Sequence, residues 1–371
     1  MATLTKFDSP LGGRSGVGVT IGKFMPLHKG HELMIEMAAA ELEELVVIVS
    51  DERGMERDPR TPDLYVRYKI IQRKYAGYDN IRVVWHRDDY GPAQKYDEQG
   101  TAVDDAFWAY WVNVFKVLAP DASYIVSSDH YGNEMAHRCD VQWFPIDPGR
   151  ELFGVSGTAI RKDPIANWAY ISREFRPYYA KKIVALGAES SGKSTLIRDL
   201  GKYFNSPAVP EYGRILSEVK PELDEDDFFD IVRRHEFMIK KACMESETGL
   251  VFVDTEKLVT WMYGKLYLDK DINEIRSRVR PEEFDLWVMI PPNLPWVDDG
   301  TRVQPDQTDR LAFFYELMDC TNPSKFYRHR REATFNRMVL DETDREKRVQ
   351  EVGAEVLKLI GRDTAEYRIQ P

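Results

Sequence analysis

The chain has 371 residues, of which 43% are hydrophobic and 30% are charged, and its formal net charge is -11. This composition is ordinary for a soluble globular protein, and a length of this order suggests two domains at about 150 residues each. The acidic balance argues against a nucleic-acid partner, and no apolar run approaches the roughly 18 residues that span a bilayer, so no membrane partner is expected.

The first half of the chain alternates short apolar runs with amphipathic stretches. Residues 1–15 contain no apolar region and are predicted to be a flexible arm rather than a signal peptide. The later segments predict strands over 17–22, 46–50, 81–85, 123–128 and 141–147, and helices over 31–45, 64–77 and 104–118. Such alternation is typical of a parallel sheet with helices on both faces.

A polar and aromatic stretch around Pro177 interrupts this alternation. We therefore predict one domain over 16–172, a linker over 173–181 and a second domain over 182–371. The second domain has predicted strands over 182–187, 206–213, 249–254 and 284–290, and helices over 193–204, 226–247, 311–318 and 344–360. The expected fold class is α/β, with a parallel sheet in each domain.

The stretch "GAESSGKS" in the second domain fits the GxxxxGK[ST] pattern of a phosphate-binding loop. Its glycines let the backbone N–H groups face a phosphate chain, and Lys193 supplies a positive charge to the β and γ phosphates. A predicted strand before the loop and a predicted helix after it favour an ATP site over a chance match. The predicted nucleotide ligands are Gly187, Ser190, Ser191, Gly192, Ser194 and Thr195.

Two carboxylates follow predicted strands near this loop. Asp254 ends "VFVD" and, with the hydroxyl of Ser194, is expected to hold Mg²⁺. Glu211 is the candidate general base for a hydroxyl acceptor, with Asp254 as the alternative base. A helix-capping Asp and an exposed, structural Glu remain the competing interpretations. Arg214, one turn beyond Glu211, is assigned to substrate binding.

Three further side chains are candidates in the second domain. Arg302 and Arg310 flank a polar segment that could close over ATP and neutralise charge on the transferring phosphoryl group. A merely solvated surface segment is the competing interpretation. Trp296 could stack on an aromatic base, although most tryptophans belong to the core.

The stretch "GKFMPLHKGH" lies between the first predicted strand and helix. Gly22 and Gly30 permit a tight turn, and His28 and His31 lie where imidazoles can donate hydrogen bonds to phosphate oxygens beside a helix N-terminus. A capping loop with two surface histidines is the alternative. A metal site would need a third ligand, and none is near in the sequence.

These residues resemble the HxGH signature of the nucleotidyltransferase superfamily, and "VSGTAIR", Val155 to Arg161, resembles its second motif. The resemblance implies a Rossmann-like domain in which a phosphate oxygen attacks the α-phosphorus of ATP and pyrophosphate leaves. The nucleophile is already anionic, so catalysis is positioning and charge stabilisation. The implied catalytic residues are Lys23, His28, His31 and Arg161, and the implied nucleotide contacts are Gly22, Phe24, Gly30, Ser156 and Thr158.

The two halves together resemble the bifunctional NadR family, which combines nicotinamide-mononucleotide (NMN) adenylyltransferase with ribosylnicotinamide kinase. The resemblance rests on "GKFMPLHKGH", "SGTAIRKDPIANW", "GAESSGKSTL", "EYGR", "VFVDT" and "PWVDDGTR". It implies nicotinamide recognition near Trp108 and Trp111, for which two core tryptophans are the alternative. Met25 and the extra proline in "MIPPNLPW" depart from the family pattern. The roughly 15 residues before Val17 are too few for a helix-turn-helix domain, so DNA-binding regulation is not expected.

The expected function is therefore the synthesis of NAD from ribosylnicotinamide through NMN, with ATP bound at two sites and Mg²⁺. Alternatives are a fusion enzyme acting on another vitamin-derived nucleotide and a non-catalytic sensor of NAD and ATP. Three scattered cysteines form no CxxC pair, so neither a zinc site nor a disulfide framework is expected and a cytoplasmic location is favoured. A homo-oligomer is left open.

Overall fold

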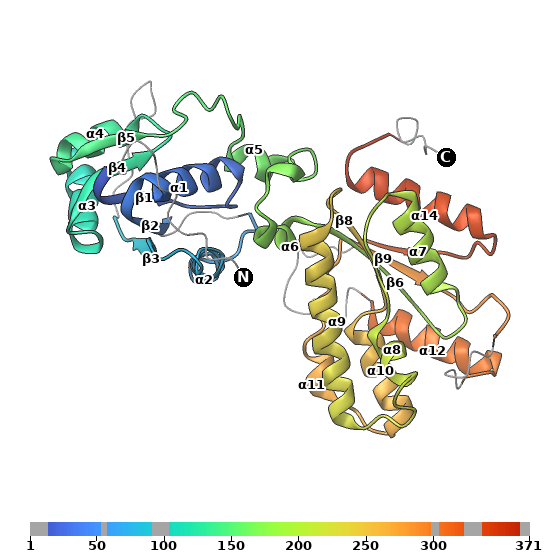
Figure 1. The fold of residues 1–371 in the computed structure, drawn as a ribbon. Helices are drawn as coiled ribbons and strands as arrows, with labels where there is room; N and C mark the ends of the chain where they lie inside the picture. The colour runs from blue at the N-terminus through green and yellow to red at the C-terminus, as the bar shows by residue number, and fades with distance from the viewer. Residues whose placement is uncertain (1–13, 53–57, 91–103, 298–303, 323–335, 364–371) are drawn as a thin grey trace. The chain divides into compact units, whose positions relative to one another are not determined.

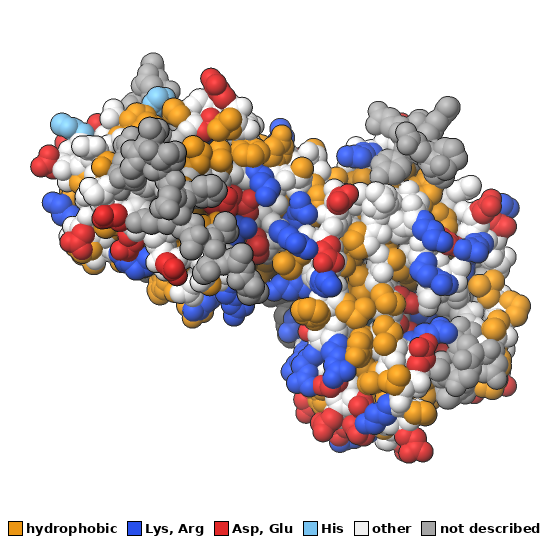
Figure 2. Space-filling model, in the orientation of Figure 1, with side chains coloured by type: hydrophobic (Ala, Val, Ile, Leu, Met, Phe, Trp, Pro, Cys, Tyr) orange, Lys and Arg blue, Asp and Glu red, His pale blue; other side chains and the backbone are white. Residues whose placement is uncertain are grey.

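The computed structural model describes residues 14–52, 58–90, 104–297, 304–322 and 336–363. The chain divides into two compact units, Met1–Tyr179 and Ala180–Pro371. None of the helices in the described ranges is long and apolar enough to cross a membrane. Acidic and basic side chains are interspersed on the visible face of each unit (Figure 2).

The first unit is built around a five-stranded parallel sheet in the order β3-β2-β1-β4-β5 (Figure 1). Its strands are β1 (Arg14–Gly22), β2 (Leu42–Glu52), β3 (Ile81–Asp88), β4 (Ala122–Ser127) and β5 (Gln142–Pro145). Its longer helices are α1 (Lys29–Glu41), α2 (Leu64–Lys74), α3 (Asp105–Leu118) and α4 (Tyr131–Cys139). The strand order reverses between β1 and β4, and in such sheets ligands bind at the carboxyl ends of the strands beside that reversal.

Aromatic side chains of α3 fill the core on one side of this sheet. Trp108 and Trp111 belong to one cluster with residues of three strands, among them Val19, Ile48 and Ile125. Their spacing of three residues places both indoles on the same face of the helix. Both tryptophans therefore lie in the hydrophobic core, as the alternative interpretation of the sequence expected.

The second unit has another five-stranded parallel sheet, in the order β10-β9-β6-β8-β7. Its strands are β6 (Lys181–Gly187), β7 (Ala208–Val209), β8 (Leu250–Asp254), β9 (Leu286–Ile290) and β10 (Arg337–Val339). Its helices include α7 (Lys193–Tyr203), α8 (Tyr212–Ser217), α9 (Glu225–Glu245), α10 (Lys257–Leu268), α11 (Asn273–Arg276), α12 (Gln307–Cys320) and α14 (Arg345–Leu359). The predicted α/β class with two parallel sheets is confirmed.

Helices α7 and α14 pack together against this second sheet. Leu196 and Leu200 of α7 share a core cluster with Val352 and Val356 of α14. Helix α7 begins directly after the phosphate loop, so α14 packs against the helix that the loop leads into.

Some element boundaries differ from the sequence predictions. The helix predicted over 31–45 ends at Glu41, because Leu42 already pairs with β1 as the first residue of β2. The strand predicted over 206–213 shortens to Ala208–Val209. Helix α10 was not predicted because all of 257–264 is buried, so no polar face marks its period.

The segment predicted as a linker, 173–181, contains a 3₁₀ turn at Arg173–Phe175, helix α6 (Arg176–Tyr179) and the first residue of β6. Phe175 is buried, and the hydroxyl of Tyr179 lies 3.2 Å from that of Thr61 in a hydrogen bond. Most of this segment therefore packs on the first unit.

Candidate active sites

The loop between β1 and α1 has a closely packed interior. A Cβ added at Gly22 would lie 2.8 Å from the ring of Phe24, so the glycine makes room for that ring. Phe24 has a positive φ of 46° and is buried, and its ring meets His31 edge to face with centroids 4.9 Å apart. The ring of Phe24 therefore packs against the imidazole of His31 and restricts its orientation. Its predicted contact with a nucleotide stays a prediction.

His28 and His31 lie side by side at the start of α1. Their rings are stacked with centroids 3.7 Å apart and planes 23° apart. Burial, reinforced by the charge of Arg150, lowers the pKa of His28 to about 4, and burial lowers the pKa of His31 well below its usual range. Both imidazoles are therefore neutral at pH 7. Within the described part of the chain, neither buried Nδ1 atom has a hydrogen-bond partner, which suits a pair that receives a ligand.

A cavity of about 130 Å³ opens beside these histidines. Its wall also contains Gly30, the loop after β4 and the segment before the second motif. Arg150 lines it and donates from Nη2 to Asp129 Oδ1 at 2.5 Å. We did not single out Arg150 from the sequence, although it lies in the same loop as "VSGTAIR". The structure thus places a cation in the same cavity wall as the two histidines.

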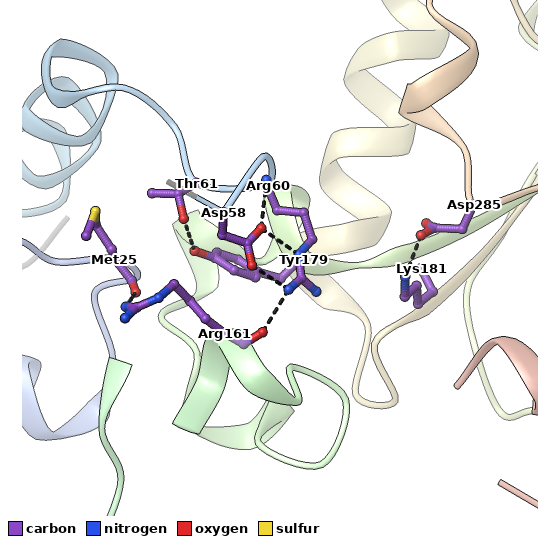
Figure 3. A network of polar contacts seen from close by, with 8 residues as sticks. All are labelled: Met25, Asp58, Arg60, Thr61, Arg161, Tyr179, Lys181 and Asp285. Atoms are coloured by element: carbon purple, nitrogen blue, oxygen red, sulfur yellow. Dashed lines mark hydrogen bonds and ion pairs between the residues drawn. The ribbon is translucent and has the colours of Figure 1, made fainter. Parts of the chain in front are cut away.

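The second motif begins two residues before α5 (Gly157–Lys162) and extends through most of that helix. Ser156 caps this helix by accepting from the N–H of Ala159, and it also lines the cavity. Arg161 donates from Nη1 to the main-chain oxygen of Met25 at 2.7 Å and from Nη2 to Thr158 Oγ1 at 3.0 Å. Figure 3 shows the contact with Met25, which joins the two motifs directly.

A second arginine, Arg60, binds the main chain of Arg161 (Figure 3). Arg60 donates to the main-chain oxygen of Arg161 at 2.8 Å, and the carboxylate of Asp58 binds Arg60 through two oxygens. The guanidinium of Arg60 also lies over the ring of Tyr179, 5.7 Å from its centroid. The end of the second motif is thus anchored to a loop that precedes α2.

Besides Gly22, Phe24 and Thr158, four predicted residues of the first unit lie away from the cavity wall. Trp108 and Trp111 are 3% and 8% exposed and belong to the core, Lys23 is exposed, and Arg161 is turned toward Met25. None of the four is among the residues that line the cavity. Their roles in substrate or phosphate binding stay predictions.

The phosphate loop of the second unit joins β6 to α7. A Cβ at Gly187 would lie 2.3 Å from the main-chain oxygen of Ile290, so this position requires glycine. Gly192 has a φ of +88°, which favours glycine for a second reason. The ammonium of Lys193 and the hydroxyl of Ser191 both donate to the main-chain oxygen of Ala188 at 2.9 Å.

Glu211 and Asp254 converge beside this loop. Burial and the nearby Asp254 carboxylate raise the pKa of Glu211 to about 7. Burial also raises the pKa of Asp254, against the opposing effects of Lys193 and of a hydrogen bond from Ser194. The hydroxyl and the carboxylate predicted to hold Mg²⁺ are therefore in contact, and oxygen donors of this kind are what Mg²⁺ prefers. No cluster of three or more His, Cys, Asp or Glu side chains suited to a metal is found among the described residues.

A cavity of about 630 Å³ lies over the loop. The predicted residues that line it are Ser190, Gly192, Lys193, Ser194, Thr195, Glu211 and Arg214. It also contains Glu189, whose carboxylate accepts from Tyr267 Oη at 3.2 Å and from the N–H of Gln304 at 3.0 Å. Tyr267 stacks on Tyr263 with centroids 5.6 Å apart. The two tyrosines lie on α10, the helix whose buried first part, 257–264, gave no amphipathic pattern in the sequence.

Gly187, Ser191 and Asp254 do not line this cavity, and three further predicted residues have other positions. Arg310 is buried and donates to the main-chain oxygen of Leu294 at 3.3 Å and to the side chain of Gln307. Trp296 is half-buried. Neither lines the large cavity. Arg302 lies outside the described residues, and all three roles stay predictions.

Family comparisons agree with this division of the chain. A family described as "Cytidylyltransferase-like" matches residues 19–163, and one described as "AAA domain" matches residues 182–348. The first match contains both histidines and the second motif, and the second contains the phosphate loop and both carboxylates.

Two curated relatives extend over most of the chain. The "Trifunctional NAD biosynthesis/regulator protein NadR" of Salmonella typhimurium is 27% identical over 345 residues, covering 87% of this chain and 80% of the relative. The protein of the same name from Escherichia coli is 28% identical over 322 residues, covering 80% and 74%. The similarity therefore includes both units.

Two solved structures share the fold. A NadR protein in complex with NR has a TM-score of 0.72 and 24% identity, covering 95% of this chain and 97% of that one. A NadR protein in complex with NAD and AMP-PNP has a TM-score of 0.71 and 22% identity, covering 95% and 98%.

Proposed function

Because the chain is a NadR-type protein, we propose that it is a bifunctional enzyme that makes NAD from ribosylnicotinamide in two ATP-dependent steps. The second unit phosphorylates the nucleoside to NMN. The first unit transfers AMP from a second ATP to NMN, releasing pyrophosphate. The curated relatives named for NAD biosynthesis cover both units and support this assignment.

In the kinase step, the phosphate loop and the start of α7 bind the ATP phosphates through main-chain N–H groups. Lys193 neutralises charge at the β and γ phosphates. Ser194 and Asp254 fit Mg²⁺, which when bound screens the phosphate charge. Glu211 accepts the proton of the attacking 5′-hydroxyl, and a pKa of about 7 suits a general base near neutral pH.

In the adenylyl-transfer step, no general base is needed because the phosphate of NMN is already anionic. His28, His31 and Arg150 line the same cavity. Neutral imidazoles donate hydrogen bonds to phosphate oxygens, and Arg150 contributes positive charge as pyrophosphate develops. Arg161 acts on this site through the loop that it holds at Met25.

The observation that carries the proposal is the presence of two separate cavities, one with the stacked histidine pair and one with the phosphate loop and Glu211, whose carboxylate is coupled to that of Asp254. The experiment is incubation of the pure chain with ribosylnicotinamide, ATP and Mg²⁺, followed by identification of every nucleotide product. Formation of both NMN and NAD supports the proposal. If neither forms, a panel of other vitamin-derived mononucleotides tests the alternative fusion enzyme.

A further inference from the structure

Arg348, on the first turns of α14, reaches the phosphate loop from the far end of the unit's sequence. Its Nη2 donates to the main-chain oxygen of Ser191 at 3.0 Å, and its Nε donates to the main-chain oxygen of Glu342 at 2.7 Å. The side chain is only 4% exposed. The segment before α14 thus fixes the guanidinium, and the guanidinium holds the loop.

The contact falls on the peptide that joins Ser191 to Gly192. A Cβ added at Gly192 would lie 2.4 Å from Nη1 of Arg348, so the guanidinium lies directly against that glycine. In a planar trans peptide the N–H points away from the C=O. Holding the oxygen of Ser191 on the α14 side therefore directs the N–H of Gly192 to the opposite side, where successive N–H groups of such a loop form an anion-binding concavity.

The carboxylate of Glu342 acts on the charge of Arg348 without contacting it, and burial outweighs this effect and lowers the pKa of the guanidinium. Within the described ranges no carboxylate forms an ion pair with it, and both of its hydrogen-bond acceptors are main-chain oxygens. A buried cation without a carboxylate in contact with it is costly unless an anion approaches it. The phosphates of a nucleotide at the loop supply such an anion across a single peptide.

We propose that Arg348 is a positioning residue of the kinase site, which orients the Ser191–Gly192 peptide for phosphate binding and adds positive charge behind the loop. It contacts the nucleotide only through the loop. The inference rests on the proposed ATP site of the second unit. It gives the last helix of the chain, whose sequence pattern is generic, a part in nucleotide binding.

The test uses Arg348→Gln and Arg348→Lys in the full chain. For Arg348→Gln the KM for ATP in the kinase reaction rises about tenfold or more, as expected for a lost hydrogen bond from a charged group. The KM for ribosylnicotinamide stays within about twofold, since Arg348 does not act on the acceptor. Arg348→Lys keeps the charge and recovers part of the affinity. NAD formation from supplied NMN, which takes place in the first unit, is unchanged, and the unchanged KM for ribosylnicotinamide shows that the second unit is folded.

Arg345→Gln is the matched control, because Arg345 lies one turn earlier on α14 and binds Asp199 of α7 at 2.6 Å while remaining exposed. It removes a contact between α14 and α7 without touching the loop. Its KM for ATP is expected to stay within about twofold of wild type, since exposed pairs contribute little. A rise equal to that of Arg348→Gln would contradict the proposal, because helix packing alone would then explain the effect.

Calorimetric titration with Mg²⁺ and a non-hydrolysable ATP analogue separates this proposal from the kinase assignment, since it needs no acceptor. The relevant site is the one that Lys193→Ala abolishes. Weaker binding at that site in Arg348→Gln supports the role of Arg348 even if ribosylnicotinamide is not the acceptor. Unchanged binding in a folded Arg348→Gln protein overturns it. Should that variant fail to fold, the same titration of Arg348→Lys decides, with unchanged affinity counting against the proposal.

Discussion

The guanidinium of Arg161 donates a hydrogen bond to the main-chain oxygen of Met25 at 2.7 Å, across 136 positions of sequence. The second nucleotidyltransferase motif thereby holds the loop that carries the first. The contact explains how a residue outside the cavity wall can affect chemistry inside it, since His28 lies three residues beyond Met25 in that loop.

We predict that Arg161→Gln lowers the rate of NAD formation from NMN by about tenfold or more, because hydrogen bonds to charged groups contribute about 1.5–3 kcal/mol each. Steady-state kinetics with supplied NMN would measure it. The kinase rate of the same protein should be unaffected. Arg82→Gln, which breaks an exposed pair with Glu44 in the same unit, serves as the control and should change little. Normal NAD formation by a folded Arg161→Gln protein would remove the positioning role.

Glu211 gives the kinase reaction a pH dependence. Its pKa is raised to about 7 in the free enzyme, and a base works only when unprotonated. The kcat/KM for ribosylnicotinamide should therefore rise with pH through about 7 and level off above it. Glu211→Gln should reduce kcat by about a hundredfold or more and abolish this rise of kcat/KM with pH. If Glu211→Gln keeps both the wild-type kcat and the rise with pH, Asp254 would become the candidate base.

His28 links stability to acidity with a definite sign. Its pKa is about 4 in the folded state against an ordinary value of 6.5, so the unfolded chain binds more protons between these values. Stability contributed by the neutral imidazole is complete above pH 6.5 and is lost as pH falls toward 4. Between pH 6.5 and pH 4.5, the melting temperature of the wild type should fall further than that of His28→Gln, because the variant lacks this titrating group. Parallel curves would mean that the folded pKa of His28 is not depressed.

Two glycines of the second unit make a contrasting pair. Gly187→Ala should destabilise this unit, because its Cβ would lie 2.3 Å from the main-chain oxygen of Ile290. Gly353→Ala, inside α14, meets its nearest atoms at 3.7 Å and should stabilise by up to about 1 kcal/mol through helix propensity. Denaturant unfolding of both variants measures the difference. Equal effects would show that the close approach of β6 to β9 is not what selects glycine at position 187.

The sequence was informative where chemistry depends on local pattern. The phosphate loop, the histidine pair and the carboxylates that end strands were all predictable, because parallel strands deliver such residues to one edge of a sheet. Contacts between distant segments were not. Arg150 lies in the loop before the second motif, Arg348 on a generic amphipathic helix, and Tyr267 on a helix that the sequence pattern did not predict.

Trp108 and Trp111 show the converse limit. A spacing of three residues fits a ligand-binding face and a core face equally well, and only the packing of α3 on the sheet places both indoles in the core. Arg310 shows the same limit. Its charge suggested contact with a phosphate, but its guanidinium donates a hydrogen bond to the main-chain oxygen of Leu294.

The central claim is that one chain carries two independent nucleotide-dependent activities. The most direct measurement follows labelled ribosylnicotinamide and, separately, labelled NMN in Lys193→Ala with ATP and Mg²⁺. The account predicts that this protein no longer phosphorylates ribosylnicotinamide but converts NMN to NAD at the wild-type rate. Failure to make NAD from NMN in the folded variant, or continued phosphorylation of the nucleoside, would contradict it.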